Sequence, residues 1–500
     1  MYSREEVKGW TDKVINMAKA DAVEVTVSGG ERSGTRWANS SITVNLVQFD
    51  RQISVNVRVG QKPGTATTRD FSDTGLRAMV DEAVAAAQQA SDSPNLPELL
   101  GPQEYLPVDA AMPSMVNFGP GERARLVKTS IDASEKLGVL GAGYIPKNDQ
   151  TTCTANSKGL FAYYRAAEAG FVLTCRLPDG SGSGWSGITG IKDLSLIDPE
   201  ALTRVAANKA IKSKGARRIE PGRYTVILEP RANARFLSLL TGIFGGGGGG
   251  GFGGGGGGGF GGGFGGGGGG GAAQPDPAAA GDPAAAGAAG GRGGAGGRGG
   301  GAGQGGGRGG GGGRGGGGNV LAGKQPGDKI LGDLFTLKSE IGNPILRQTP
   351  ILGDNRPAKP VTWVEKGLLR AVGGNQPANV NMSLVQEGSN LSIEDMVKQT
   401  RRGLLVTFFW YIRGVPSDDQ PLLNTGMTRD GLFLIENGEI TRPVQNFRWN
   451  MSPLVGYNNL SLVGKPVPIH TGEAYDGGGT ALVPPVRIED FYMTSVSPAV

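Results

Sequence analysis

The chain has 500 residues, a formal net charge of +5, one histidine and two cysteines. This length suggests several domains, but residues 245–318 are nearly all glycine and alanine and must be set aside first. That segment contributes four arginines and two aspartates, or +2, so the remaining chain carries +3, which is too weak to indicate nucleic-acid or membrane binding.

An N-terminal α+β domain, a sheet with helices on one side, is predicted over residues 1–220. Ser3 and Glu6 fit a capping box, and apolar residues follow at helical spacing from Val7. The patterns predict these further elements in chain order: strands over 22–27, 41–49, 52–59 and 65–69; a helix from 72; a helix over 121–137; strands over 139–145, 151–155 and 171–177; a flexible turn over 181–187; and a helix from Asp198, with Pro199 first, to Gly215.

The cysteines and the N-terminus bear on the compartment. Cys153 and Cys175 fall in different predicted strands and form no Cys-x-x-Cys pair. Two free thiols in a reducing cytoplasm are favoured over a disulfide between neighbouring strands. The charged start of the chain is not typical of a secretory signal, and no apolar run is long enough to span a membrane, so we expect a soluble cytoplasmic protein.

Residues 221–244 predict a short apolar strand over 224–228 and then a helix from Pro230 to Phe244. The insertion at 245–318 has no periodicity and almost no side chains. Ordering glycine costs much backbone entropy, and no apolar surface would be buried in return, so we expect disorder across most of it.

The arginines of the insertion also allow an alternative interpretation, in which this segment binds RNA. Arg292, Arg298, Arg308 and Arg314 lie among glycines, as in the RGG tracts that bind RNA. Its phenylalanines, however, lie in a separate half that has no arginine, so an expanded flexible loop is the favoured interpretation.

A β-rich antiparallel domain is predicted over residues 319–500. Its elements are strands over 362–365, 383–385 and 487–494, three strand-like runs between 404 and 450, and one helix from about 393 to 402 that Ser392 caps. Asn437-Gly438 predicts a type I′ hairpin in which 434–435 pairs with 440–441.

Several of these stretches resemble the TldD/PmbA family. Residues 404–407, 431–438 and 440–444 resemble its C-terminal signature, and residues 36–41, 156–160 and 327–331 resemble other motifs of the family. The resemblance implies a relative of the heterodimeric zinc peptidases of bacteria and archaea that were historically called modulators of DNA gyrase. One subunit of such a pair carries the zinc and the other does not.

The zinc motif of that family is missing here. In catalytic members, a helix after the strand that matches 224–228 carries His-Glu, three residues and a second His, and a Cys in a Gly-rich loop completes the ligands. In this chain, residues 231–244 contain no His, Glu or Asp, and the expected Cys loop, residues 413–426, has no Cys. His470, the only histidine, is far from both in sequence and is better explained as a surface or strand-end residue than as a catalytic base.

The resemblance therefore implies a non-catalytic PmbA/TldE-like subunit, with no catalytic residue, metal ligand or cofactor of its own. We expect a zinc-bearing TldD-like partner in a heterodimer, and an unfolded peptide as the substrate of the complex. Candidate peptide-groove or subunit-contact residues are Arg429, Asp430, Glu436, Asn437 and Arg442. The alternative is a stand-alone binding protein for peptide, or for RNA through the insertion.

Overall fold

The computed structural model describes residues 2–244, 320–347, 350–372, 375–473 and 479–497. The helices are α1 (Arg4–Met17), α2 (Asp73–Gln89), α3 (Pro113–Val116), α4 (Pro120–Lys136), α5 (Pro199–Lys212), α6 (Pro230–Thr241), α7 (Ile393–Lys398) and α8 (Pro453–Asn458), with short 3-10 turns at Leu194–Leu196 and Gly242–Phe244. The expected α+β class is confirmed. The predicted disorder of 245–318 concerns residues outside those described. Within the described ranges, no helix is both long and apolar enough to cross a membrane.

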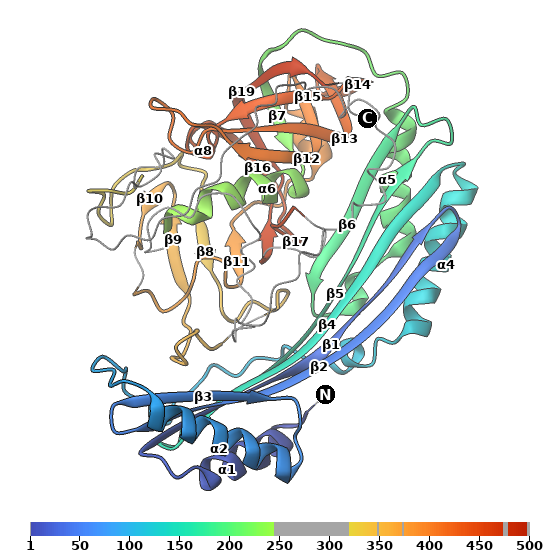
Figure 1. Cartoon of the computed structure of the whole chain (residues 1–500). Coiled ribbons are helices and arrows are strands. Elements are labelled where there is room, and N and C mark those ends of the chain that lie inside the picture. Colours follow the sequence, from blue (N-terminus) through green and yellow to red (C-terminus); the bar gives the residue numbers. More distant parts are fainter. Residues whose placement is uncertain (1, 245–319, 348–349, 373–374, 474–478, 498–500) are drawn as a thin grey trace, which may run out of the picture. The chain divides into compact units, whose positions relative to one another are not determined.

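The N-terminal part is one antiparallel sheet of six strands in the order β3-β2-β1-β4-β5-β6 (Figure 1). Its strands are β1 (Ala22–Ala38), β2 (Ser41–Val59), β3 (Lys62–Thr68), β4 (Leu140–Asn156), β5 (Phe161–Arg176) and β6 (Ser183–Ile191). One face is covered by two helix pairs. Helices α1 and α2 pack on Val23, Val25 and Val27 of β1, whereas α4 and α5 pack near Trp37 at the other end of that strand.

Local signals at helix ends were predictive. Both hydrogen bonds of the capping box are present, because the Glu6 amide donates to Ser3 Oγ at 3.1 Å and the Ser3 amide donates to Glu6 at 2.7 Å. Asp198 caps α5 by accepting from the Ala201 amide at 2.9 Å.

The strands predicted from the sequence are shorter than those of the structure. The pairs 41–49 and 52–59, and 139–145 and 151–155, are continuous in β2 and β4, because each strand is held by long ladders to its neighbours.

The predicted turn over residues 181–187 is wrong. Residues from Ser183 onward form β6, and Trp185 is buried. A Cβ at Gly184 would collide with the backbone oxygen of Ala206 on α5, and a Cβ at Gly182 would collide with that of Ala210. The glycines therefore permit close packing of a helix on the sheet, not chain reversal.

The C-terminal part contains two sheets. One has the order β10-β9-β8-β11-β18-β17, and the other has the path β12-β7-β19-β15-β13-β14, with β16 on β19. Their strands are β7 (Gly222–Leu228), β8 (Leu337–Ser339), β9 (Val361–Glu365), β10 (Leu368–Leu369), β11 (Leu384–Gln386), β12 (Arg402–Gly414), β13 (Asn424–Glu436), β14 (Glu439–Pro443), β15 (Phe447–Met451), β16 (Leu460–Val463), β17 (Val467–His470), β18 (Thr480–Val483) and β19 (Val486–Val496). Pairing is mostly antiparallel, but β7–β12 and β11–β18 are parallel. Helix α6 lies between the two sheets, within a single apolar core (Figure 1).

The predicted hairpin is present, but its predicted register holds at one pair only, because a bulge sets Leu434 opposite Arg442 instead of Thr441. Ile435 pairs with Ile440, and Asn437 and Gly438 both have positive φ, of 52° and 81°. The predicted helix over 393–402 is too long, because α7 ends at Lys398 and Arg402 opens β12 opposite Glu436. Strand pairing with a distant segment overrides the local helix pattern here.

The two cysteines are free and buried, as favoured from the sequence. Cys175 lies opposite Gly141 of β4, whereas Cys153 lies twelve residues farther along that strand. At ~3.4 Å per residue this separation is roughly 40 Å, so no disulfide can join them.

Candidate functional site

Helix α6 follows β7 and is the helix on which the family resemblance led us to look for a zinc motif. Pro230 occupies its first turn, and the chain enters it through Glu229, whose amide donates to Val406 of β12 at 2.9 Å. Nearly every residue of α6 is buried, and Leu240 is in the core as expected. The polar side chains that it carries are therefore held in the interior and must find partners there.

One face of α6 bears two arginines directed at the segment after β17. Arg231 donates from Nη1 to the carbonyl oxygen of His470 at 2.7 Å and from Nη2 to that of Glu473 at 3.0 Å. Arg235 donates to the carbonyl oxygen of Thr471 at 2.9 Å and lies 3.8 Å from the Glu473 carboxylate. Arg231 also lies over the Phe408 ring, 5.3 Å from its centroid. The two guanidinium groups thus fix the backbone of this segment.

Another side of α6 carries an amide network. Asn233 Nδ2 donates to Gln386 Oε1 and to the Pro484 carbonyl oxygen, both at 2.8 Å, and Asn233 Oδ1 accepts from the Tyr457 hydroxyl at 2.8 Å. All four groups lie in the core between the two C-terminal sheets. Burial raises the pKa of Tyr457 well above its usual value, so this hydroxyl stays protonated and donates.

The histidine that is remote in sequence lies beside α6 in the fold. The His470 amide donates to Thr189 Oγ1 of β6 at 2.7 Å, and its carbonyl accepts from Arg231. Nearby, Glu168 of β5 accepts from Arg347 at 2.8 Å and from Thr480 at 3.3 Å. Burial alone would raise the pKa of Glu168, but Arg347, His470 and Thr480 together hold it below its usual value. A buried ionised cluster therefore joins β5 to the C-terminal domain.

The groups on α6 do not fit a zinc ion. A guanidinium stays protonated and has no lone pair to offer to a metal. Among the described residues, no group of three or more His, Cys, Asp and Glu is placed to hold a metal. Both cysteines lie in the N-terminal sheet. The arginines instead supply fixed positive charge and hydrogen bonds to backbone oxygens.

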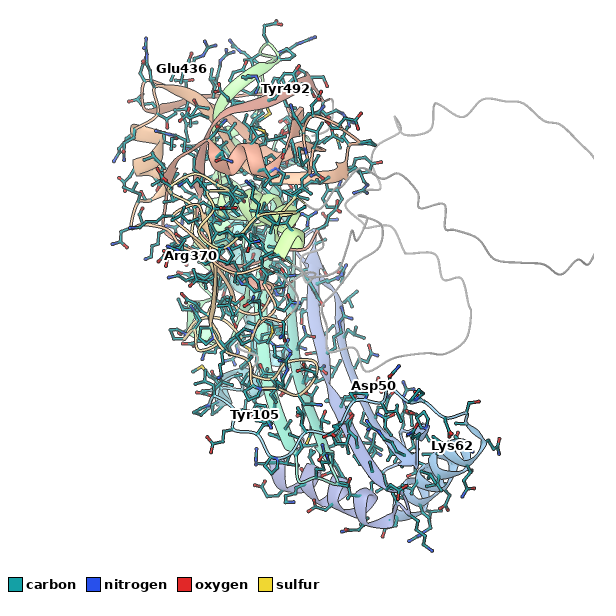
Figure 2. The ribbon with its side chains drawn as sticks, turned by 90° about the vertical axis from the view of Figure 1, so that its left-hand side faces the viewer. Asp50, Lys62, Tyr105, Arg370, Glu436 and Tyr492 are labelled. Atoms are coloured by element: carbon teal, nitrogen blue, oxygen red, sulfur yellow. The ribbon has the colours of Figure 1, made fainter. Side chains whose placement is uncertain are left out.

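The five candidate residues from the sequence fall into separate groups. Arg429 and Asp430 are adjacent on β13, and the Arg429 guanidinium lies 5.3 Å from the centroid of the Trp410 ring. Glu436, which Figure 2 labels, ends β13 at the hairpin turn, and Asn437 follows it in that turn. Both are about 20 Å from Asp430 at the usual rise per strand residue. Arg442 lies between them, opposite Leu434. The structure therefore does not gather the five into one site.

Asp430 has three unusual features. It is buried, its φ is +54°, and its Oδ1 has no hydrogen-bond partner among the residues that the structure describes. Burial raises the pKa of its carboxyl, and Arg429 and Ser183 offset this only in part. A strained backbone with a buried carboxyl is a feature of functional sites, and no local sequence signal marked it beyond the resemblance.

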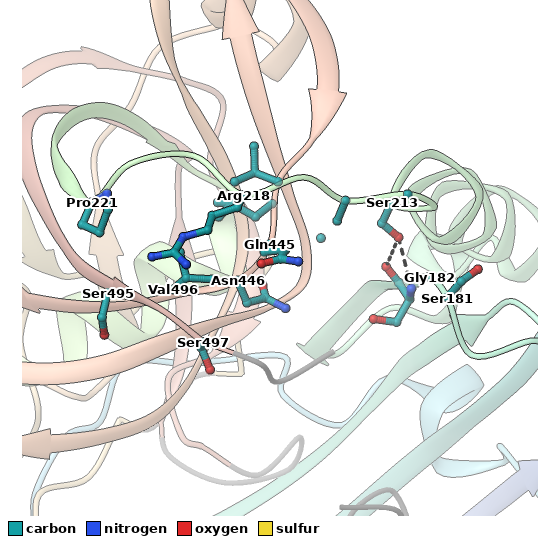
Figure 3. A pocket seen from close by; sticks show the side chains of 16 residues that line it. Ser181, Gly182, Ser213, Arg218, Pro221, Gln445, Asn446, Ser495, Val496 and Ser497 are labelled. Atoms are coloured by element: carbon teal, nitrogen blue, oxygen red, sulfur yellow. Dashed lines mark hydrogen bonds between the residues drawn. The ribbon is translucent and has the colours of Figure 1, made fainter.

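A hollow of about 710 Å³ begins at the next residue, Gly431. Figure 3 shows Arg218 and Asn446 on one side of it and Gly182 and Ser213 on the other. Its polar lining consists of hydroxyl and amide side chains and one cation: Ser181, Ser183, Ser213, Gln445, Asn446, Ser495, Ser497 and Arg218. The Ser183 amide donates to Ser213 Oγ at 3.1 Å, which fixes one wall. Such a lining can donate to and accept from an extended polypeptide backbone.

Comparisons with models of known protein families give matches along most of the described chain. Three domains of one family match the chain: the PmbA/TldA metallopeptidase domain 1 over residues 23–87, the central domain over 144–214 and the C-terminal domain over 317–495. Together they cover more than half of the chain. A search of curated proteins found no match.

Solved structures agree on the fold. TldE from Thermococcus kodakarensis is 16% identical, with a TM-score of 0.70 over 97% of this chain and 100% of that one. A putative modulator of a DNA gyrase from Thermotoga maritima is 14% identical, with a TM-score of 0.69 over 97% and 99%. A putative modulator of DNA gyrase from Bacteroides thetaiotaomicron is 12% identical, with a TM-score of 0.66 over 99% and 100%. The chain belongs to the PmbA/TldD metallopeptidase family.

Proposed function

We propose that this chain is the non-catalytic, PmbA/TldE-like subunit of a cytoplasmic TldD/PmbA-type peptidase that degrades unfolded or modified peptides. A zinc-bearing TldD-like subunit would be its partner. The fold likeness to TldE supports this assignment, although at 16% identity it extends to the fold alone.

The observation that carries the proposal is the pair of arginines on α6. At the position where catalytic relatives place imidazoles, Arg231 and Arg235 bind the backbone oxygens of residues 470, 471 and 473. The hydrogen bonds hold together the helix and the segment that follows β17. Helix α6 itself contains no His, Cys, Asp or Glu, which favours a structural role in the complex.

In this role the hollow beside Gly431 would hold part of the peptide. Its hydroxyl and amide lining suits backbone amide and carbonyl groups, and Arg218 offers one cation to a carboxylate. Arg429 and Asp430 directly precede Gly431, which lines the hollow, and would position this part of its wall. Glu436, Asn437 and Arg442, on the exposed hairpin, would instead contact the other subunit.

The test is to purify the chain alone and together with a sibling that carries His-Glu-x-x-x-His. We expect no stoichiometric zinc in the chain alone, co-purification with the sibling, and chelator-sensitive cleavage of an unfolded peptide only by the pair. One zinc per isolated chain, or chelator-sensitive proteolysis by it, would contradict the assignment.

A matched pair of variants tests the peptide wall. Arg217 and Arg218 are adjacent and exposed, but only Arg218 lines the hollow. In the complex, Arg218→Ala is expected to raise KM for an unfolded peptide severalfold, and Arg217→Ala is expected to leave it unchanged. Equal effects of the two variants would remove the hollow from the proposal.

A further inference from the structure

The hollow beside Gly431 has one charged residue in its lining, and that residue is a cation. Arg218 supplies the charge, and neither Asp nor Glu is among the described residues of the lining. Arg218 is exposed, and in the described part of the chain no carboxylate forms an ion pair with it. Asp179, close to the wall at Ser181, is 3.4 Å from Lys214 instead. The charge of the hollow therefore favours an anionic ligand.

The acidic residue that precedes Gly431 does not cancel this positive charge. Asp430 is buried, and burial raises the pKa of its carboxyl, so the negative form is disfavoured. Its Oδ2 also lies 4.0 Å from Arg429 Nε, which balances the charge of the ionised form. Asp430 therefore adds little negative potential to the hollow.

Side chains near Arg218 can complete the recognition of a carboxylate. Figure 3 shows Asn446 and Ser495 on the same side of the hollow as Arg218. The Thr428 hydroxyl accepts from the Phe447 amide at 2.9 Å and donates to Asn446 Oδ1, also at 2.9 Å. This bond orients the Asn446 amide so that its nitrogen is the donor on the side away from Thr428. Carboxylates form their strongest hydrogen bonds with a guanidinium, and neighbouring N–H and O–H donors add to them.

The volume and the glycines of the hollow suit a peptide better than a small anion. At about 710 Å³ the hollow is within the usual range of ligand pockets, ~300–1,000 Å³, so a phosphate ion would leave most of it empty. Gly182, Gly215 and Gly431 line it, and an added Cβ at Gly215 would meet nothing within 4 Å. Wall segments without side chains let another backbone approach closely. A single arginine also matches the single charge of a carboxylate.

Arg218 lies at one end of the hollow. Figure 3 shows it beside Pro221 and Ser495, whereas Ser181 and Ser213 lie at the opposite end. A peptide that enters past Ser213 therefore reaches the arginine last. We infer that the hollow binds the carboxyl-terminal end of an unfolded peptide, with its α-carboxylate at Arg218. This inference rests on the proposed function, which places peptide in the hollow, and adds which end of the peptide is recognised.

Peptide binding to the full chain alone tests the inference, because the assay needs neither zinc nor a partner. The probe is a short unfolded peptide with uncharged side chains, labelled at its amino end and made with either a free carboxylate or a terminal amide. Fluorescence anisotropy is expected to show about tenfold weaker binding of the amide peptide, because the charge-assisted hydrogen bonds to its end are lost.

A double-mutant cycle separates this contact from an effect on folding. Arg218→Ala should bind the two peptides equally, with the affinity that the wild type has for the amide peptide. Arg217 is the matched control, since it is exposed and adjacent but does not line the hollow, and Arg217→Ala should keep the preference of about tenfold. A variant that only disturbs the fold would weaken both peptides alike. Near-UV circular dichroism verifies that both variants fold.

Four results would overturn the inference. They are equal affinity of the wild type for the two peptides, an acid preference that Arg218→Ala retains, no binding of the acid peptide with a Kd below about 1 mM, and tight binding of an amide peptide that carries an internal Asp. The last result would mean that the hollow takes any carboxylate. None of the four bears on the subunit assignment, which co-purification with a zinc-bearing sibling tests separately.

Discussion

Replacing Arg231 by alanine should release the segment after β17 from α6. The guanidinium makes two hydrogen bonds to backbone oxygens, at 2.7 and 3.0 Å, and lies over Phe408. Hydrogen bonds of a charged group contribute roughly 1.5 kcal/mol or more each, and a cation over a ring about 1 kcal/mol. The expected loss is about 4 kcal/mol. Arg231→Met, which keeps most of the volume, should lose about 3 kcal/mol.

Amide hydrogen exchange of the peptide over residues 467–473 is the decisive assay, because a protein with several domains need not unfold in two states. A loss of about 4 kcal/mol corresponds to an increase in exchange of up to about a thousandfold. Arg223 is the matched control, since it also donates to a carbonyl, that of Asp490 at 3.1 Å, and lies over Tyr492, but it is exposed. If Arg231→Ala exchanges no faster than Arg223→Ala, the arginine does not hold this segment.

Three further outcomes are expected. Glu168→Gln should cost about 2–3 kcal/mol of unfolding free energy in urea, because it removes the buried partner of the partly buried Arg347. Glu200→Gln, in an exposed pair of equal 2.8 Å length, should cost under about 0.5 kcal/mol, and similar losses for the two variants would show that burial does not set the cost. Burial raises the pKa of the Asp430 carboxyl, so the protonated carboxyl stabilises the fold at low pH, and this stabilisation is lost as the pH rises through the folded-state pKa. The melting temperature of Asp430→Asn should therefore exceed that of the wild type by an amount that grows from about pH 4 to pH 8. The exposed control Asp419→Asn should show no such trend. Replacing 245–318 with an eight-residue Gly-Ser linker should preserve near-UV circular dichroism and change stability by at most about 2 kcal/mol, and failure to fold would show that the segment is structural.

The linker prediction rests on two observations of the structure. Phe244, before the segment, and Leu321, shortly after it, lie in the same apolar core. Strand β7 pairs with β12 and β19, which follow the segment in sequence. The chain ends on either side are thus already held together by the sheet.

Local signals in the sequence located several elements because neighbouring residues decide them. The capping boxes at Ser3 and Ser392 and the Asn437-Gly438 turn depend on side chains and φ angles within a few residues. The missing zinc motif could be recognised in the same way, since a metal-binding helix needs its ligands at fixed spacing. The family resemblance rested on such short stretches.

Contacts between distant segments could not be predicted in this way. The glycines at the start of β6 suggested a turn. In the structure they leave the space that α5 needs to pack closely on the sheet, and this contact between distant segments has no local sequence pattern. Asp430 is likewise ordinary in sequence, and its burial and strain come from the β-sheet around it.

The sequence by itself determined the α+β class, the helix ends, the hairpin and the absence of a zinc motif on α6, because each depends on residues close together along the chain. Only the tertiary structure decided that His470 lies beside α6, that Arg231 binds a backbone oxygen 239 residues away, and that, within the described residues, β3 pairs only with residues 53–59 of the long strand β2. These features depend on which segments meet, and that is set by packing of the whole core rather than by any local pattern.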